Sequence, residues 1–275
     1  MRDAVLRTRV PTLVIVTLVG SLLQSAQPPQ AAQNTQGAAE LAALRARAEK
    51  GDADAQVKLG TTYASGRGVA QDFAQAVTWY RKAADQGHAG AQSLLGIFYG
   101  KGLGVVQDYA QSSAWYRKAA DQGNVGAQSL LGILYHNGQG VPQDYAQAVV
   151  WFRKAANQGD ADAQSNLGFA YSNGQGVPRD YAQAAVWFRK AADQGLADAQ
   201  ANLAFSYANG QGVVRDLIEA QKWYNLAASR ALRAENQTKY AEARDTLAKL
   251  MTVAQLAEAQ QRARAWQQAF EGKRP

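Results

Sequence analysis

An aspartate recurs once every 36 residues through the middle of the chain, and it is the most regular residue of a catalytic type. A carboxylate can act as a general acid or base. An active site, however, is built once, whereas this aspartate is repeated along the chain. Each copy also precedes a helix-forming segment, where its side chain can accept hydrogen bonds from the free N–H groups of a new helix. We therefore interpret the column as helix caps: Asp72, Asp108, Asp144, Asp180 and Asp216.

Other residues that could carry chemistry do not form a recognised site. The two histidines, His88 and His136, occupy different positions of the 36-residue period and share no pattern of acidic partners, so we expect surface histidines. The absence of cysteine excludes thiolate metal sites and a cysteine nucleophile. Glycine-rich segments such as "SGRGV" and "NGQGV" lack the Lys-Ser/Thr and the preceding strand of a phosphate-binding loop. The sequence therefore predicts no enzyme, no cofactor and no metal.

A repeated arginine-lysine pair raises the question of nucleic acid, because the chain has 29 basic against 22 acidic residues and a net charge of +7. A basic ridge can neutralise phosphates. These pairs, however, fall in the last turn of a predicted helix, where cations complement the helix dipole. We expect no nucleic-acid partner. The pairs are Arg81 and Lys82, Arg117 and Lys118, Arg153 and Lys154, and Arg189 and Lys190.

The elements that position these residues form five rows of 36 residues. In every row the fifth residue is Ala, the ninth Leu and the thirteenth Tyr, which places three apolar residues on one helical stripe. A glycine then ends this first helix, and the capping aspartate begins a second helix that carries Trp, Tyr or Phe, and Ala-Ala. Each row is predicted to be a helix-turn-helix hairpin. The rows are 51–86, 87–122, 123–158, 159–194 and 195–230.

Helices this short are marginal in water, and one hairpin cannot cover the Trp, Tyr and Leu that it carries. Each hairpin must therefore pack its apolar side on a like neighbour, and like neighbours need like contact residues. A helical unit with this period predicts an all-α solenoid in which each unit touches the units beside it. The recurring aromatic rings are expected to lie buried between hairpins.

The two ends differ from the array. Residues 1–26 combine arginines, an apolar run and small polar residues, the layout of a signal peptide. The apolar run is shorter than the roughly 20 residues of a spanning helix, so we expect a periplasmic or secreted chain with no membrane insertion after cleavage. The alternative is a membrane anchor if the signal is uncleaved. Residues 27–37 are predicted to be a disordered linker, 38–50 an N-terminal capping helix, and 231–275 C-terminal capping helices that leave the period.

The row pattern resembles the Sel-one-like repeat (SLR) family, a relative of the tetratricopeptide repeats. The resemblance covers about 180 residues and implies a right-handed superhelix whose concave side is lined by the first helices. It also implies a role in binding proteins or assembling complexes, often at bacterial envelopes. Ala204 and Ser112 depart from the pattern. In the third row the pattern is carried by Ala127, Leu131, Gly132, Tyr135, Gly138, Gly140, Val141, Asp144, Ala148, Trp151, Phe152, Ala155, Ala156 and Gly159.

Positions that vary while the framework stays fixed are the candidate binding residues. By the same resemblance, columns 11 and 15 of the first helices face the groove, and they offer an apolar strip beside a row of amides. Such a strip suits an extended peptide. The alternative is that column 11 packs against the first helix of the next row. The candidate peptide groove comprises Ile97, Lys101, Ile133, Asn137, Phe169, Asn173, Phe205 and Asn209.

Together these features predict a right-handed α-solenoid of five repeats with capping helices at both ends. We expect a non-enzymatic scaffold or adaptor of the bacterial cell envelope that binds a protein or extended peptide in its concave groove. The alternative is an envelope glycan or peptidoglycan binder, in which the Trp and Tyr rings would stack on sugars. The sequence does not indicate an oligomeric state.

Overall fold

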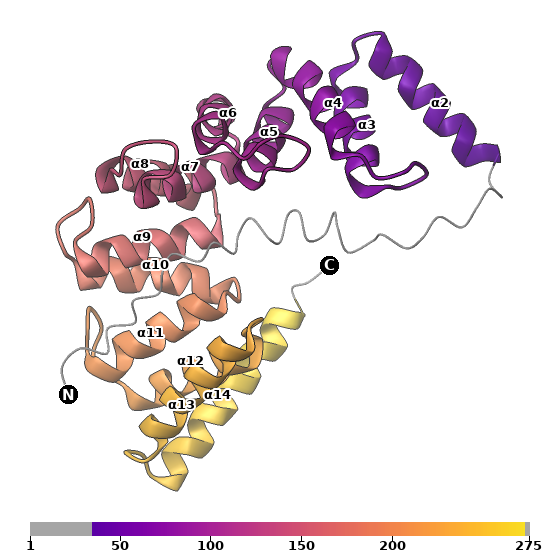
Figure 1. Ribbon diagram of the computed structural model, residues 1–275. Helices are drawn as coiled ribbons and strands as arrows, with labels where there is room; N and C mark the ends of the chain where they lie inside the picture. Colours follow the sequence, from indigo (N-terminus) through magenta and orange to yellow (C-terminus); the bar gives the residue numbers. More distant parts are fainter. Residues whose placement is uncertain (1–34, 273–275) are drawn as a thin grey trace. The chain divides into compact units, whose positions relative to one another are not determined.

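A computed structural model describes residues 35–272, which form thirteen α-helices and no strand (Figure 1). The predicted signal peptide and residues 27–34 of the predicted linker lie outside this range. The chain divides into two compact units: the first ends at Trp151 and the second begins at Phe152. Among the described residues, no helix combines the length and apolar character that crossing a membrane requires.

Every row contains the predicted pair of helices, which confirms the hairpin repeat. The first helices are α3 (Ala53–Ser65), α5 (Ala89–Lys101), α7 (Val125–Asn137), α9 (Ala161–Asn173) and α11 (Ala197–Asn209). The second helices are α4 (Phe73–Asp85), α6 (Tyr109–Asp121), α8 (Tyr145–Asn157), α10 (Tyr181–Asp193) and α12 (Leu217–Arg230). The boundary between the two units falls inside α8.

The helix ends follow the sequence signals. Asp72 accepts a hydrogen bond from the Gln75 N–H at 2.9 Å, and its four equivalents cap their helices in the same way. The glycine after each first helix, such as Gly138 with φ 68°, takes the left-handed conformation that ends a helix at low cost. The recurring aspartates are therefore confirmed as helix caps.

The recurring apolar columns form the core of each unit. The five repeat tryptophans are at most 9% exposed and the leucines of the ninth column at most 1%. Within each unit, the second helix of one repeat packs on the first helix of the next, as α4 does on α5 and α10 on α11. The predicted fold class, an all-α array of stacked helical repeats, is thus confirmed.

Helix α2 (Thr35–Glu49) covers the first repeat and begins three residues earlier than predicted. Thr35, Gln36 and Gly37 belong to this helix and not to the linker, because the first turn needs no intrahelical partner for its N–H groups and tolerates such residues. Gln56 donates its side-chain N–H to the Ala48 carbonyl at 3.0 Å, as Gln92 does to Ala84 one repeat later. Helix α2 therefore packs on α3 as a second helix would.

The C-terminal helices keep the period of the elements although the residues change. Helix α14 (Val253–Glu271) starts one 36-residue period after α12, and α13 (Ala234–Ala248) starts within one residue of its expected place. The tail therefore leaves the residue pattern of the rows, as predicted, while its helices keep the spacing of a repeat. Both helices pack on α12. In α14 the contact includes Trp266, whose ring centroid lies 5.8 Å from that of Trp223.

Candidate functional site

The residue types that could support catalysis have structural roles. His88 caps α5: its Nδ1 accepts from the Ala91 N–H at 3.1 Å, while Nε2 lies 3.1 Å from the Asp54 carboxylate. His136 lies with its ring 5.0 Å from that of Tyr145, and burial lowers the pKa of His136. Across residues 35–272, no group of three His, Asp or Glu side chains is arranged to hold a metal ion.

The arginine of each predicted basic pair clamps the next repeat. Arg153 Nη2 donates to the Tyr171 hydroxyl at 2.8 Å, and Arg81, Arg117 and Arg189 make the same bond to Tyr99, Tyr135 and Tyr207. The Arg117 guanidinium also lies 5.1 Å from the centroid of Trp151. A guanidinium that lies over aromatic rings and donates to a tyrosine hydroxyl stabilises the contact between repeats. The helix dipole alone was therefore an incomplete explanation.

In three of the four pairs the lysine lies over the tryptophan of its own helix. The Nζ atoms of Lys82, Lys118 and Lys190 lie 4.0–4.1 Å from the ring centroids of Trp79, Trp115 and Trp187. These cations therefore also contact the aromatic rings of their own helices. The sequence signal for the clamp was available, because each of these arginines precedes its tyrosine by 18 residues, beginning with Arg45 and Tyr63.

Buried glutamines tie the repeats together in a way that the sequence reasoning missed. Gln92 Nε2 donates to the Ala84 carbonyl of the preceding repeat at 3.1 Å, and its Oε1 accepts from Gln122 at 2.7 Å. Gln164 is bonded in the same way to Ala156 and Gln194. The signal was an invariant polar residue beside the invariant alanine, where a surface position would have varied.

The predicted groove is only partly present. Ile97 is 2% exposed and Ile133 is 4% exposed, so the expected apolar strip is wrong in the second and third repeats. Their neighbours Leu94, Phe98, Leu130 and Leu134 make α5 and α7 apolar around most of the helix, and such helices are buried. Phe169 and Phe205 in the second unit remain partly exposed.

The polar residues of the predicted groove also differ in exposure. Asn137, Asn173 and Asn209 are exposed, whereas Lys101 is partly buried and burial lowers its pKa. Asn173 Nδ2 donates to the Phe169 carbonyl at 3.0 Å, and Asn209 Nδ2 donates to the Phe205 carbonyl at 2.9 Å. These hydrogen bonds at the helix ends use one of the two amide N–H groups of each side chain.

Two neighbouring first helices of the second unit carry the same four residues at the same spacing. We call them the Asp–Asn–Phe–Asn stripes; the spacing of four, three and four residues places each set on one face of its helix. All eight side chains are partly buried or exposed. Sequence reasoning found only the Phe and Asn halves. The stripes are Asp162, Asn166, Phe169 and Asn173 on α9, and Asp198, Asn202, Phe205 and Asn209 on α11.

The acidic ends of the stripes lie close together. Burial, followed by the charges of Asp160 and Asp198, raises the pKa of Asp162 to about 6. Asp198 accepts from the Tyr240 hydroxyl at 2.5 Å and from Asn236 at 3.3 Å. Across residues 35–272, neither Asp162 nor Asp198 has a cationic partner. The face therefore concentrates uncompensated negative charge.

Replacing Asp162 with Asn should stabilise the second unit above pH 6 and have little effect below pH 4. Because the folded chain holds the Asp162 proton more tightly, that proton stabilises the fold below the ordinary pKa of 3.8, and the stabilisation is lost as pH rises through about 6. The gain is at most about 3 kcal/mol, since one pKa unit corresponds to about 1.4 kcal/mol. Denaturant melts at both pH values measure it.

The exposed Asp54, which lies at the same column of the first repeat and contacts His88, provides the control. The Asp54→Asn variant should gain no stability at neutral pH. A gain as large as that of Asp162→Asn would mean that burial among carboxylates is not the cause.

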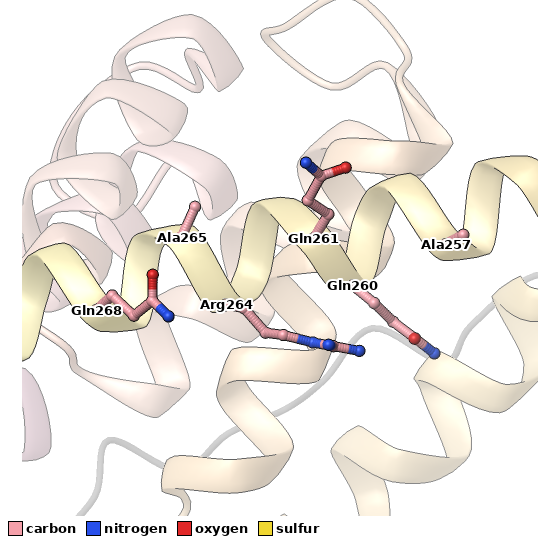
Figure 2. A pocket seen from close by; sticks show the side chains of 6 residues that line it. All are labelled: Ala257, Gln260, Gln261, Arg264, Ala265 and Gln268. Carbon is pink, nitrogen blue, oxygen red and sulfur yellow. The ribbon is translucent and has the colours of Figure 1, made fainter.

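Hollows elsewhere offer little chemistry. One of about 420 Å³ is bordered by Ala257, Gln260, Gln261, Arg264, Ala265 and Gln268, which project from successive turns of α14 (Figure 2). Arg264 is the one charged residue among them. Another, of about 490 Å³, lies between α4 and the loop at Gly104 and Val105, where Arg81 and Lys82 already contact Tyr99 and Trp79. The second hollow is also bordered by Thr78 and Asp85, on the same helix as Arg81 and Lys82.

The stacked hairpins, their shared clamp and their aspartate caps define a helical-repeat scaffold. Residues 53–88, 89–124, 125–160, 161–196 and 197–232 each match the Sel1 repeat, so the chain belongs to the Sel1 repeat family. No curated protein matches the chain. Proteins of this family are helical repeat scaffolds that often serve protein interactions.

Two solved structures resemble the chain over most of its length. A Sel1 repeat protein from Oxalobacter formigenes is 29% identical with a TM-score of 0.68, and the match covers 84% of this chain and 97% of that one. The protein c5321, a protective antigen present in uropathogenic Escherichia coli strains and displaying an SLR fold, is 33% identical with a TM-score of 0.55. That match covers 82% of this chain and 55% of c5321.

Proposed function

We propose that the chain is a non-enzymatic adaptor that binds a protein or an extended peptide on the first-helix face of its second unit. The observation that carries the proposal is the pair of Asp–Asn–Phe–Asn stripes on α9 and α11. Exposed Asn side chains beside partly exposed Phe rings offer amide groups that can hydrogen-bond a peptide backbone and an apolar contact for one of its side chains.

The fixed columns support binding over catalysis. Asp caps, Arg clamps and buried Gln are each engaged in holding helices or repeats together, so they supply framework and leave the variable columns for recognition. The alternative of a glycan binder is disfavoured, because the repeat tryptophans are at most 9% exposed and offer no open indole face for a sugar.

We also propose export to the periplasm or the medium, with cleavage after Ala26. The support is the charged and apolar layout of residues 1–26. Mass determination of the N-terminus of the mature chain tests it. A chain that begins at Met1 and sediments with membranes would contradict cleavage and favour the membrane-anchored alternative.

The double variant Phe169→Ala with Asn173→Ala should lose the partner. Removing a ring and an amide from the centre of a small interface is expected to weaken binding by about 2 kcal/mol or more. Affinity capture from the native host with the full chain, followed by mass spectrometry of bound proteins, compares the variant with the parent.

The control for this experiment is Val186→Ala with Asp193→Ala, two exposed positions on the second helix α10 of the same repeat. The control should retain whatever the parent captures. Equal capture by the α9 variant and the parent would remove the first-helix face as the site, and loss in the α10 variant alone would move the site to the second helices.

A further inference from the structure

The first-helix face of the second unit carries the carboxylates of Asp162 and Asp198, and their charge specifies the partner. We propose that the Asp–Asn–Phe–Asn stripes of α9 and α11 bind an extended peptide through one of its lysine or arginine side chains, seated beside Phe169 and Phe205 and paired with the Asp162 carboxylate. This inference rests on the proposed function and narrows its ligand to a basic peptide.

Among residues 35–272, no lysine or arginine is paired with the two carboxylates of this face. Asp162 is mostly buried and makes no hydrogen bond or ion pair with any residue in the range 35–272. The partners of Asp198 are Tyr240 and Asn236, both neutral donors. Carboxylates held near one another repel, and a guanidinium or ammonium group brought between them relieves that repulsion and gains a charge-assisted hydrogen bond.

Within residues 35–272, a partly buried carboxylate without a cationic partner occupies this column in the second unit and not in the first. In the first repeat the residue at this column, Asp54, is exposed and lies against His88. In the second and third repeats the column is Gly90 and Gly126. A requirement of the helix dipole would apply to all five first helices, so it does not explain a column that is Asp in three repeats and Gly in two.

The face is rich in hydrogen-bond acceptors. Asn173 and Asn209 each donate one N–H to the Phe169 and Phe205 carbonyls, and their amide oxygens accept no hydrogen bond from residues 35–272. Two carboxylates and two amide oxygens match an occupant that is rich in donors. An extended peptide supplies backbone N–H groups, and a lysine or arginine supplies the positive charge.

Each stripe carries a phenylalanine ring between its asparagines. Phe169 and Phe205 are both partly exposed, and Phe169 packs against the core of the second unit, which fixes the orientation of its ring. Aromatic faces attract cations and also cover the aliphatic part of a long basic side chain. The rings therefore favour a lysine or arginine over a short polar residue.

Selection of random linear peptides displayed on phage, with the full chain immobilised, tests the proposal. We expect the retained pool to be enriched in lysine or arginine at one position. A synthetic peptide from that pool, labelled with a fluorophore, should bind about tenfold or more weakly by anisotropy when its basic residue is replaced by glutamine. The same loss is expected for the protein variant Asp162→Asn with Asp198→Asn, which keeps side-chain shape and the acceptor for Tyr240.

Asp54→Asn is the matched control and should bind the peptide as the parent does. A retained pool that depends on Phe169 and Asn173 but carries no basic residue, or an acidic pool, would overturn this inference and leave the proposed function standing. A pool whose binding is unaffected by Phe169→Ala with Asn173→Ala would overturn both. Unchanged denaturant midpoints of all variants at the assay pH, or higher ones for Asp162→Asn, show that a loss of binding is not a loss of fold.

Discussion

Replacing Gly140 with Ala should destabilise the array far more than the same replacement at Gly68. Both glycines have a positive φ, 70° and 74°, so both variants carry a left-handed penalty of about 1–2 kcal/mol. A Cβ at Gly140 would lie 2.0 Å from the Tyr109 carbonyl oxygen of the preceding repeat, whereas a Cβ at Gly68 has nothing within 4 Å. Overpacking of this kind costs about 1–3 kcal/mol more, occasionally beyond that.

Denaturant unfolding of the two variants followed by far-ultraviolet circular dichroism gives the difference directly. Gly104, whose Cβ would lie 2.3 Å from the Phe73 carbonyl carbon, should behave as Gly140 does. Equal losses at Gly140 and Gly68 would mean that the loop of one repeat does not rest on the second helix of the repeat before it.

Truncating Trp223 to Ala should cost about 3–5 kcal/mol, the range for removing a fully buried aromatic side chain. Trp223 is 0% exposed, and its ring lies under the Arg189 guanidinium at 5.2 Å and against Trp266 at 5.8 Å. The substitution therefore opens a cavity where the last repeat meets its C-terminal cap. Because units of a repeat protein are stabilised by their neighbours, α13 and α14 should loosen first.

Limited proteolysis and a thermal melt measure this second effect. The Trp223→Ala variant should be cut earliest in α13 or α14 and melt at a clearly lower temperature. Leu250→Ala, a change at a residue that is 65% exposed, should alter the melt little. An unchanged melt for Trp223→Ala would show that the recurring tryptophan does not hold neighbouring helices together.

The hairpins were predictable because their signals are local. The Ala, Leu and Tyr columns lie on one helical stripe, Gly138 stops a helix, and Asp144 begins the next, all within a single row. Because the rows repeat, each row can pack on the next, which predicts that the tryptophans are buried between rows. The capping box of Thr252 with Gln255 was likewise visible in the sequence and is present at the start of α14.

Features that depend on the neighbouring repeat were harder to see. Ile97 and Phe169 occupy the same column and are both apolar, yet only Ile97 is fully buried. The difference lies in the flanking columns: α5 carries Leu94 and Phe98, whereas α9 carries Asn166 and Ala170. The clamp from Arg153 to Tyr171 also crosses a repeat boundary. A single row contains only one of the two residues, so it gives no reason to expect their contact.

Hydrogen–deuterium exchange of the full chain, with and without a peptide selected for binding, tests the central claim most directly. That claim is that fixed columns hold the repeats together while the variable columns of α9 and α11 bind the partner. The account predicts that the bound peptide slows exchange in α9 and α11 and leaves α10 unchanged. Slower exchange in α10 or in the loops, with α9 and α11 unaffected, would contradict it.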